Sequence, residues 1–423
     1  MLIVSQIAAE KNRYVAGLEK RGLANATQLL DEVLALDQKR KDTQQELDNN
    51  LAEANRISKQ IGALMKAGKR EEAEAVKAKT AALRGRNKEL GEVLDQVQEE
   101  LKQALYNIPN IPNEIVPAGK TEEDNEVIKT VGDLPELAEG AVPHWDLIKQ
   151  YDIIDFNLGI KITGAGFPVY KGKGARLQRA LVNFFLDEAA SAGYSEVQPP
   201  IVVNEASGYG TGQLPDKEGQ MYHITAEDLY LIPTAEVPIT NLYRDVIVSE
   251  DQLPAKHVGF TPCFRREAGS WGSHVRGLNR LHQFDKVEIV QIRKADESYQ
   301  ALDEMCDHVA GLLSKLELPY RILRLCSGDL GFTSAITYDF EVYSAAQKKW
   351  LEVSSVSNFE TYQANRLKLR YKDENKKKHL LHTLNGSAMA LPRIMAAILE
   401  NRQDTEGISI PEVLIPYTGF ERI

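Results

Sequence analysis

Cysteine is almost absent from this chain of 423 residues, which contains only Cys263, Cys306 and Cys326. The three lie far apart, without a CxxC spacing or a nearby pair of histidines, so neither a disulfide scaffold nor a cysteine-rich zinc site is expected. The sequence also lacks any run of 18 apolar residues that could span a membrane as a helix. Its first residues contain neither the charged segment nor the apolar core of an export signal. We therefore expect a cytosolic protein with no membrane span.

Positive charge is also in short supply, because 51 Lys and Arg residues stand against 61 Asp and Glu residues, for a net charge of -10. Such a chain is not an obvious nucleic-acid binder unless its basic residues are concentrated in one place. With 43% hydrophobic and 26% charged residues, its composition is that of a soluble globular protein and not of a disordered one. The length is sufficient for two or three domains.

Proline and tryptophan are missing from residues 27–107, where Tyr106 is the only aromatic residue. Good helix formers fill this segment, and its apolar residues recur at steps of four and three. Eight of eleven such positions are apolar in residues 29–64, and seven of nine are apolar in residues 76–104. Two heptad seams joined at residues 67–69 predict an antiparallel coiled-coil hairpin.

The distal half of this hairpin is basic, although the whole chain is acidic. Residues 55–88 carry a net charge of +7, which leaves -17 for the rest of the chain. A solvated coiled-coil surface is one explanation, since Lys and Arg are common at outward positions. Clustering at one end favours another, an arm that binds the phosphates of a large polyanion through counterion release. The basic residues are Arg56, Lys59, Lys66, Lys69, Arg70, Lys77, Lys79, Arg84, Arg86 and Lys88.

A second domain is expected after the hairpin. Two prolines in residues 107–113 end the second helix, and the acidic, Gly- and Pro-rich residues 118–143 predict an extended connection. We therefore expect a helical domain over residues 1–110 and another domain over residues 111–423.

The second domain is predicted to be α+β. Helical periodicity covers residues 175–192 and 295–317. Regular helices do not alternate with the predicted strands, which favours an antiparallel sheet. The predicted strands are residues 196–203, 229–232, 257–264, 285–292, 337–344 and 350–355.

Four polar clusters lie on or beside these strands, and in the first two a Glu follows a Thr or an Arg by two residues. On an extended chain Thr234 and Glu236 share a face, where they could hold an ammonium group. Arg265 and Glu267 share a face in the same way before a Gly-rich loop, and an Arg fork suits a phosphate or a carboxylate. Taken alone, each cluster also fits ordinary surface charge.

The other two clusters are rich in hydroxyl groups. Glu352 and Ser354 share a face, with Ser355 on the opposite face unless the strand bends, and a Glu with a Ser can supply oxygen ligands to Mg²⁺. Residues 383–388 predict a turn before a helix at 389–400 that carries Arg393, and a helix start favours anions. The alternatives are a hydroxyl-rich strand end and, for Ser387, a plain helix N-cap.

In their order and spacing these segments resemble the seryl-tRNA synthetases of the bacterial type. The resemblance rests on TAEVPITN at 234–241, FRREAGS at 264–270 with the strand that returns to residue 288, EVSSVSNF at 352–359 and HTLNGSAMALPR at 382–393. The basic hairpin resembles the tRNA-binding arm of that family, and residues 193–200 resemble the dimer-forming motif 1 of class II synthetases. The resemblance covers essentially the whole chain and implies an antiparallel sheet flanked by helices in a homodimer.

The resemblance implies a two-step reaction. ATP and L-serine would give seryl-adenylate and pyrophosphate, and serine would then pass to the 3′ end of tRNA(Ser), or of tRNA(Sec) where the organism has one. Arginine and Mg²⁺ directed at the α-phosphorus stabilise the developing charge in place, so no covalent protein nucleophile is needed. The sequence accordingly shows no plausible nucleophilic triad.

Roles carry over residue by residue from the family motifs. Arg265, on motif 2, would bridge the ATP α-phosphate and the serine carboxylate, and Glu267 would accept a hydrogen bond from the adenine amino group. Arg393, on motif 3, would hold the γ-phosphate side, and these three are the implied catalytic residues. The implied serine site is Thr234, Ala235, Glu236, Arg265, Glu288, Asn385 and Ser387. The implied ATP site is Arg265, Arg266, Glu267, Phe284 against the adenine, Glu352, Val353, Ser354, Ser355 and Arg393, with Glu352 and Ser355 on Mg²⁺.

The chain departs from the family pattern at two places. Ser273 and His274 stand where Arg-Asp is usual, before Val275-Arg276-Gly277. In motif 3, Ala388 and Pro392 stand where Gly is more usual, and proline is tolerated in the first turn of a helix. We expect Arg393 to keep its place.

Three other functions compete with this prediction. The basic hairpin argues against a ligase that charges a carrier protein. Retention of five charged residues argues against an inactive scaffold, and the HTLNGS segment argues against a synthetase for threonine or proline. The five are Arg265, Glu267, Glu288, Glu352 and Arg393.

Overall fold

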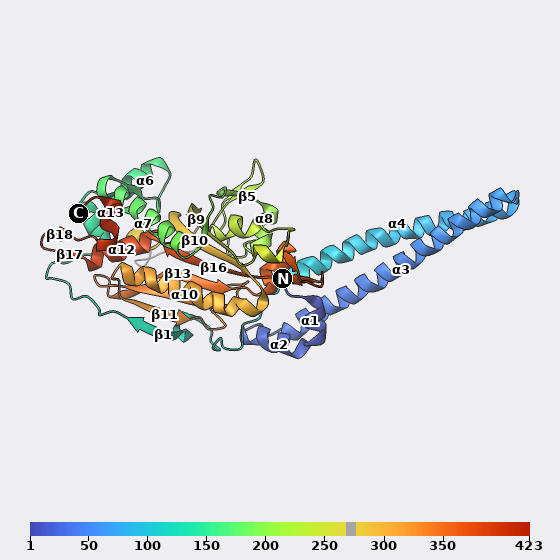
Figure 1. Cartoon of the computed structure of the whole chain (residues 1–423), viewed down its shortest axis with the longest axis horizontal. Helices are drawn as coiled ribbons and strands as arrows, with labels where there is room; N and C mark the ends of the chain where they lie inside the picture. The colour runs from blue at the N-terminus through green and yellow to red at the C-terminus, as the bar shows by residue number, and fades with distance from the viewer. Residues whose placement is uncertain (268–275) are drawn as a thin grey trace. The chain divides into compact units, whose positions relative to one another are not determined.

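The computed structural model describes residues 1–267 and 276–423, except for the side chain of Ala78, and divides into two compact units (Figure 1). The first unit contains Met1–Glu19 and Leu23–Pro109, and the second contains Lys20–Gly22 and Asn110–Ile423. Within the described ranges, no helix is both long and apolar enough to cross a membrane.

Four helices make up the first unit, and the predicted hairpin is confirmed. They are α1 (Val4–Ala9), α2 (Lys11–Lys20), α3 (Ala26–Lys66) and α4 (Arg70–Tyr106). Helices α3 and α4, called the arm from here on, are joined at residues 67–69, where Gly68 takes the left-handed backbone (φ +79°) that a residue without Cβ adopts at little cost.

Burial along the arm follows the heptad seams. All eleven predicted seam positions in α3 and all nine in α4 are buried or half-buried, even those that are polar. Val33, Ile57 and Leu90 are among the buried apolar members. Thr43 is buried too, and its hydroxyl donates a hydrogen bond to the carbonyl of Lys39 at 2.8 Å. The side-chain period of 3.5 residues therefore determines which face of each helix is covered.

An eight-stranded sheet organises the second unit, and the predicted antiparallel topology is confirmed. All neighbouring strands pair antiparallel except β9 and β4, which pair in parallel. The order is β1 (Glu126–Val131), β11 (Tyr320–Arg324), β12 (Ile336–Ser344), β13 (Lys349–Asn358), β16 (His382–Ala390), β10 (Gln283–Arg293), β9 (Ala255–Phe264) and β4 (Ser195–Glu196).

Three helices cover one face of this sheet and form the main core with it (Figure 1). They are α7 (Gly172–Ser191), α10 (Ser298–Lys315) and α12 (Leu391–Asn401). Strand β10 shows why the two faces differ: Val287 and Ile289 enter this core, whereas Val290 and Ile292 enter a second core with α9 (Glu236–Asn241) and α11 (Thr361–Leu367). Alternation of side chains along β10 thus separates a helix-covered face from one that carries the cavity described below.

Shorter elements complete the unit. The helices are α5 (His144–Gln150), α6 (Phe156–Ile162), α8 (Glu205–Thr211) and α13 (Ile415–Thr418). The strands are β2 (Ile154–Asp155), β3 (Val169–Tyr170), β5 (Val202–Asn204), β6 (His223–Ile224), β7 (Leu229–Leu231), β8 (Ile247–Val248), β14 (Arg370–Lys372), β15 (Lys378–Leu380), β17 (Gln403–Asp404) and β18 (Gly407–Ile408).

Three predictions about these segments are wrong. The strand predicted at 196–203 is two short strands in different sheets, β4 and β5, because two prolines separate them. Residues 118–143 are more than a connection, since they contain the edge strand β1. The turn predicted at 383–388 is instead the buried central strand β16, paired on both sides. Ser387 is therefore no N-cap; that position of α12 is held by Ala390.

Candidate active site

One cavity of about 600 Å³ brings most of the predicted site residues together. It is lined from β10 by Phe284, Lys286 and Glu288, which alternate along one face of that strand. Further lining residues come from the segment that follows β9, from β13 and β16, from the start of α12 and from the turn before α9. The predicted residues among them are Thr234, Glu236, Arg265, Glu267, Phe284, Glu288, Glu352, Val353, Ser354, Ser355, Asn385, Ser387 and Arg393.

The predicted serine-binding groups form a buried polar pocket within the cavity. Glu288 on β10 lies directly opposite Ser387 on β16, and Asn385 lies two residues along the same strand. Thr234 and Glu236 reach the cavity from the turn before α9. These five side chains are at most 7% exposed, so each polar atom needs a partner from the protein or from a ligand.

Thr234 and Glu236 share a side of the cavity for a different reason from the predicted one. They do not lie on an extended strand, because Glu236 is the first residue of α9. The Thr234 hydroxyl accepts the backbone N–H of Glu236 at 3.2 Å, which closes the turn and holds both side chains at the cavity. The prediction of a strand was wrong here.

Lys286 is a site residue that the sequence analysis missed. Its ammonium is buried, donates to the Thr234 hydroxyl at 2.8 Å and lies 2.5 Å from a carboxylate oxygen of Glu288. These are two of the groups expected to receive the substrate ammonium. The alternation of Phe284, Lys286 and Glu288 was a signal that could have found it, because all three had to lie on the same face of a strand.

Glu236 is held by a chain of side chains that was also missed. Gln363 of α11 donates to its carboxylate at 2.6 Å, and the hydroxyl of Thr383 donates to Gln363 at 2.7 Å. Burial, and next the charge of Glu288, raise the pKa of Glu236 to about 7, against hydrogen bonding from Gln363 and the charge of Lys286. A bound cation would favour the ionised form of this carboxyl group.

The predicted adenine side of the cavity contains Arg265, Glu267 and Phe284. Strand β9 ends at Phe264, so Arg265 and Glu267 do not alternate on a strand as predicted, and Glu267 has a left-handed backbone (φ +48°). The guanidinium of Arg265 lies 5.3 Å from the centre of the Phe284 ring. Glu267 pairs with Arg280 at 3.0 Å, and Arg280, to which no role was assigned, also lines the cavity.

A β-bulge in β13 corrects the predicted faces of Glu352, Ser354 and Ser355. Glu352 pairs with Glu341 and Ser354 with Phe340, so Val353 is an extra residue in the strand. The bulge returns Glu352 and Ser355 to a common face, which regular alternation would have separated. Ser354 is instead buried and donates to the carbonyl of Ser387 at 2.6 Å.

Arg393 lies in the first turn of α12 and spans two other segments. Its Nε donates to the carbonyl of Asn279 at 2.9 Å, and an Nη donates to the carbonyl of Glu352 at 2.7 Å. Pro392 occupies the tolerated first turn of the helix, and Ala388 is buried in the main core. Both departures in motif 3 therefore leave Arg393 at the cavity.

Two predicted residues do not line the cavity. Ala235 is buried in the second core, and Arg266 is exposed. The departure at Ser273 and His274, together with Val275, lies outside the described residues.

The ten basic residues predicted to bind tRNA are all exposed on the arm. Five are in ion pairs with neighbouring carboxylates: Arg56, Lys69, Lys77, Arg86 and Lys88. The other five form no ion pair with any residue of the described chain: Lys59, Lys66, Arg70, Lys79 and Arg84.

Comparison with known proteins identifies the family. Residues 1–112 match the seryl-tRNA synthetase N-terminal domain, and residues 222–402 match the class II tRNA synthetase core domain of the G, H, P, S and T enzymes. The serine--tRNA ligase of Salinibacter ruber is 50% identical over 425 residues, covering 100% of this chain and 99% of that protein.

Solved structures agree with these matches. The crystal structure of seryl-tRNA synthetase from Pyrococcus horikoshii complexed with ATP has a TM-score of 0.92 at 33% identity, covering 100% of this chain and 99% of that one. The cytoplasmic serine-tRNA ligase of Naegleria fowleri in complex with AMP has a TM-score of 0.84 at 26% identity, covering 97% and 95%. The chain therefore belongs to the seryl-tRNA synthetases, the class II enzymes that use ATP to join serine to tRNA.

Proposed function

We propose that the cavity binds ATP and serine side by side and that its charged residues have the roles carried over from the family motifs. The observation that supports this proposal most is the convergence of Arg265, Arg393, Glu288 and Ser387, which are far apart in the sequence, on one cavity. Arg265 contacts both proposed sides of the cavity: its Nε donates to the carbonyl of Pro233 at 3.4 Å, next to Thr234, and its guanidinium lies 5.3 Å from the centre of the Phe284 ring. Its planar fork suits both a phosphate and a carboxylate.

Adenylate formation needs positioning and charge stabilisation. The serine carboxylate attacks the α-phosphorus, an O–P bond forms, and the bond to the departing pyrophosphate breaks. Arg265 would stabilise the charge that develops at the α-phosphate, while Arg393 would hold the γ-phosphate end. Glu267 would accept a hydrogen bond from the adenine amino group, and Phe284 would stack on the adenine ring.

Glu352 and Ser355 fit Mg²⁺ only as partial ligands. The described part of the chain has no group of three or more His, Cys, Asp or Glu side chains arranged to hold a metal ion. Mg²⁺ commonly keeps several waters and is held by one or two carboxylates together with substrate phosphates. The donor set that the bulge at Val353 brings together suits an ion that arrives with ATP, where it would neutralise phosphate charge.

The serine pocket supports selectivity for a hydroxylated amino acid. Thr234, Glu236 and Glu288 would surround the ammonium group, and Glu288 with Ser387 would bond the hydroxyl, close to Asn385. Alanine would leave these buried groups unpaired, so the pocket can discriminate against alanine by roughly 10⁴-fold. Threonine would have to be excluded by lack of room for its methyl group.

We further propose that the arm binds tRNA(Ser), or tRNA(Sec) where present, through its exposed basic residues. The enzyme is proposed to be a homodimer that forms at motif 1, and support comes from β4, an exposed strand at the edge of the sheet. Location in the cytosol stays a prediction.

Serine-dependent exchange of pyrophosphate into ATP, measured with each of the twenty amino acids in turn, tests the site. We expect exchange with serine alone, and a reaction without amino acid sets the background. Comparable exchange with threonine or alanine would contradict the pocket assignment, and absence of exchange with serine would contradict the assignment of both substrates to this cavity.

A further inference from the structure

A fully buried carboxylate lies at the far end of the helix that carries Arg393. Glu400 is 0% exposed and follows Arg393 by seven residues, so the two lie on the same face of α12 two turns apart. Its position near the helix C-terminus is unfavourable for a negative charge, and a buried ion costs more than an apolar residue of the same size. Stability alone is therefore a poor reason for a carboxylate here.

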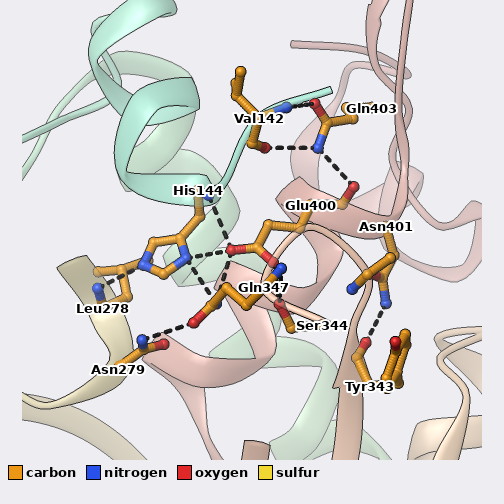
Figure 2. A network of polar contacts seen from close by, with 11 residues as sticks. Val142, His144, Leu278, Asn279, Tyr343, Ser344, Gln347, Glu400, Asn401 and Gln403 are labelled. Carbon is orange, nitrogen blue, oxygen red and sulfur yellow. Dashed lines mark hydrogen bonds and ion pairs between the residues drawn. The ribbon is translucent and has the colours of Figure 1, made fainter. Parts of the chain in front are cut away.

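Several donors converge on this carboxylate (Figure 2). One oxygen accepts the backbone N–H of His144 at 2.9 Å, the Nδ1–H of the same residue at 2.6 Å and the amide of Gln347 at 2.9 Å. The other accepts the hydroxyl of Ser344. Burial is the largest single effect and acts to raise the pKa of Glu400, but the hydrogen bonds from His144 and Ser344 together outweigh it and hold the pKa below its usual value.

This arrangement fixes the tautomer of His144. Its Nδ1 is committed as a donor to Glu400, and its Nε2 accepts the backbone N–H of Leu278 at 2.8 Å. The imidazole, itself 0% exposed, therefore fixes the turn Gly277–Asn279 through the backbone of its middle residue, Leu278. Contact is so close that a Cβ on Gly277 would lie 2.3 Å from Nε2, and that glycine has a left-handed backbone (φ +67°).

The same turn is held a second time by Arg393. The carbonyl of Asn279 accepts from Arg393 Nε at 2.9 Å, and the Asn279 amide donates to Gln347, which in turn donates to Glu400. One face of α12 thus fixes the turn at two points, through Arg393 near its start and through Glu400 and His144 near its end. Leu278, Asn279 and Arg393 all line the cavity.

We infer that His144 and Glu400 are positioning residues for ATP: they set the turn Gly277–Asn279 and, through it, the guanidinium of Arg393. Loss of the acceptor for Leu278 would free the turn and remove the fixed partner of Arg393 Nε. The serine pocket lies on β10, β16 and the turn before α9, so binding of serine would be unaffected. This inference rests on the proposed placement of ATP in the cavity.

Two substitutions of His144 separate its two bonds. In His144→Asn the amide can replace Nδ1 and keep the bond to Glu400, but nothing reaches Leu278. In His144→Gln the longer amide can replace Nε2 and keep the acceptor for Leu278. We expect His144→Asn to raise the KM for ATP in pyrophosphate exchange about tenfold, the effect of losing one well-placed hydrogen bond, and His144→Gln to change it at most about threefold. The KM for serine should stay at the wild-type value in both.

Gln403→Ala is the matched control, because Gln403 ties the end of α12 to the segment before α5 without touching the turn. Its amide bonds both the N–H and the carbonyl of Val142 at 2.9 Å (Figure 2). We expect this variant to lower the melting temperature and leave the KM for ATP unchanged. Gln347→Ala removes the side chain that links the Asn279 amide to Glu400 and leaves His144 and Arg393 unchanged. It gives an independent test if the His144 variants fail to fold, and it should raise the KM for ATP about threefold.

The outcomes distinguish this inference from the site assignment. Equal KM values for ATP in His144→Asn, Gln347→Ala and wild type would overturn it, as would equal impairment of His144→Asn and His144→Gln. Arg393→Ala is the reference: if it leaves exchange unchanged, the placement of ATP fails, whereas a severe defect in Arg393→Ala alone leaves that placement intact and refutes only the positioning role.

Discussion

The arm and the cavity place charged side chains in opposite environments. The ten basic residues of the distal half of the arm are exposed, and half of them pair with a carboxylate. In the cavity Lys286, Glu236 and Glu288 are nearly inaccessible and bond to one another or to neighbours at fixed distances. Exposed charges act at long range, are screened by salt and tolerate small shifts, whereas buried ones depend on each partner. Binding a large polyanion and activating a small amino acid need these two different uses of charge.

Arg265→Ala should show the largest effect, because it removes a positive charge that lines the cavity and is proposed to contact the α-phosphate. Loss of a preorganised group that stabilises developing charge costs about 100- to 1,000-fold in rate, and we expect a drop of that size in serine-dependent pyrophosphate exchange. Affinity for tRNA, measured by filter binding, should not change. Arg266→Ala removes the same charge from the exposed neighbouring position and should cost far less. Similar losses in the two variants would show that net charge matters and position does not.

The same contrast explains how much could be predicted from the sequence. The arm was predictable because its burial depends on a local heptad repeat, and every seam position is covered as expected. Strand β16 was not, since Asn385-Gly386-Ser387 has the composition of a turn and only pairing with β10 and β13 makes it a strand. The bulge at Val353 was equally invisible, because register between strands leaves no trace in one strand's own sequence.

The site was predictable from the residues only in part. Chemistry and alternation pointed to Arg265 and Glu352, whereas Glu288 and the roles of all three came from the resemblance to the family. Gln363 and His144 act through other side chains, and nothing near them in the sequence indicates which groups the fold brings to them. Partners joined across more than a hundred residues can be recognised only once the fold is known.

Glu236→Gln should sharpen the description of buried charge through its dependence on pH. A pKa raised to about 7 from 4.5 means that the folded enzyme binds a proton between these pH values where the unfolded chain has released it. Stability of the ligand-free wild type therefore falls relative to the variant as pH rises from about 4.5 to 7, and the difference levels off near 3 kcal/mol, an order-of-magnitude value. Denaturant unfolding at several pH values measures it.

Ionisation of Glu236 lowers the stability of the ligand-free enzyme, but it should strengthen the binding of serine. The neutral Gln cannot pair with the substrate ammonium, so we expect the KM for serine at pH 8 to rise at least about tenfold in Glu236→Gln, with the KM for ATP unchanged. In the wild type the KM for serine should rise as pH falls below about 7, because protonation then removes the charge. A KM for serine that is independent of pH between 6 and 8 in the wild type would remove Glu236 from contact with the ammonium group.

Neutralising basic residues on the arm should have the smallest effect of the changes considered. It tests whether each exposed charge contributes to tRNA binding independently of its neighbours. One variant changes the unpaired Lys59, Lys66, Lys79 and Arg84 to Gln, and a matched variant changes Arg56, Lys69, Lys77 and Lys88, each of which has a carboxylate partner. Both lose four charges over nearly the same stretch of helix.

We expect the first variant to weaken tRNA binding about tenfold at moderate salt. It should also flatten the plot of log affinity against log salt by roughly 0.7–0.9 per lost phosphate contact. The matched variant should lose less, about threefold, because a paired cation must leave its carboxylate before it can bind a phosphate. Exchange of pyrophosphate should be unchanged in both, as the reaction in the cavity does not need tRNA. Equal losses in the two variants would mean that the arm acts as a diffuse positive field, and no loss in either would remove these residues from the tRNA interface.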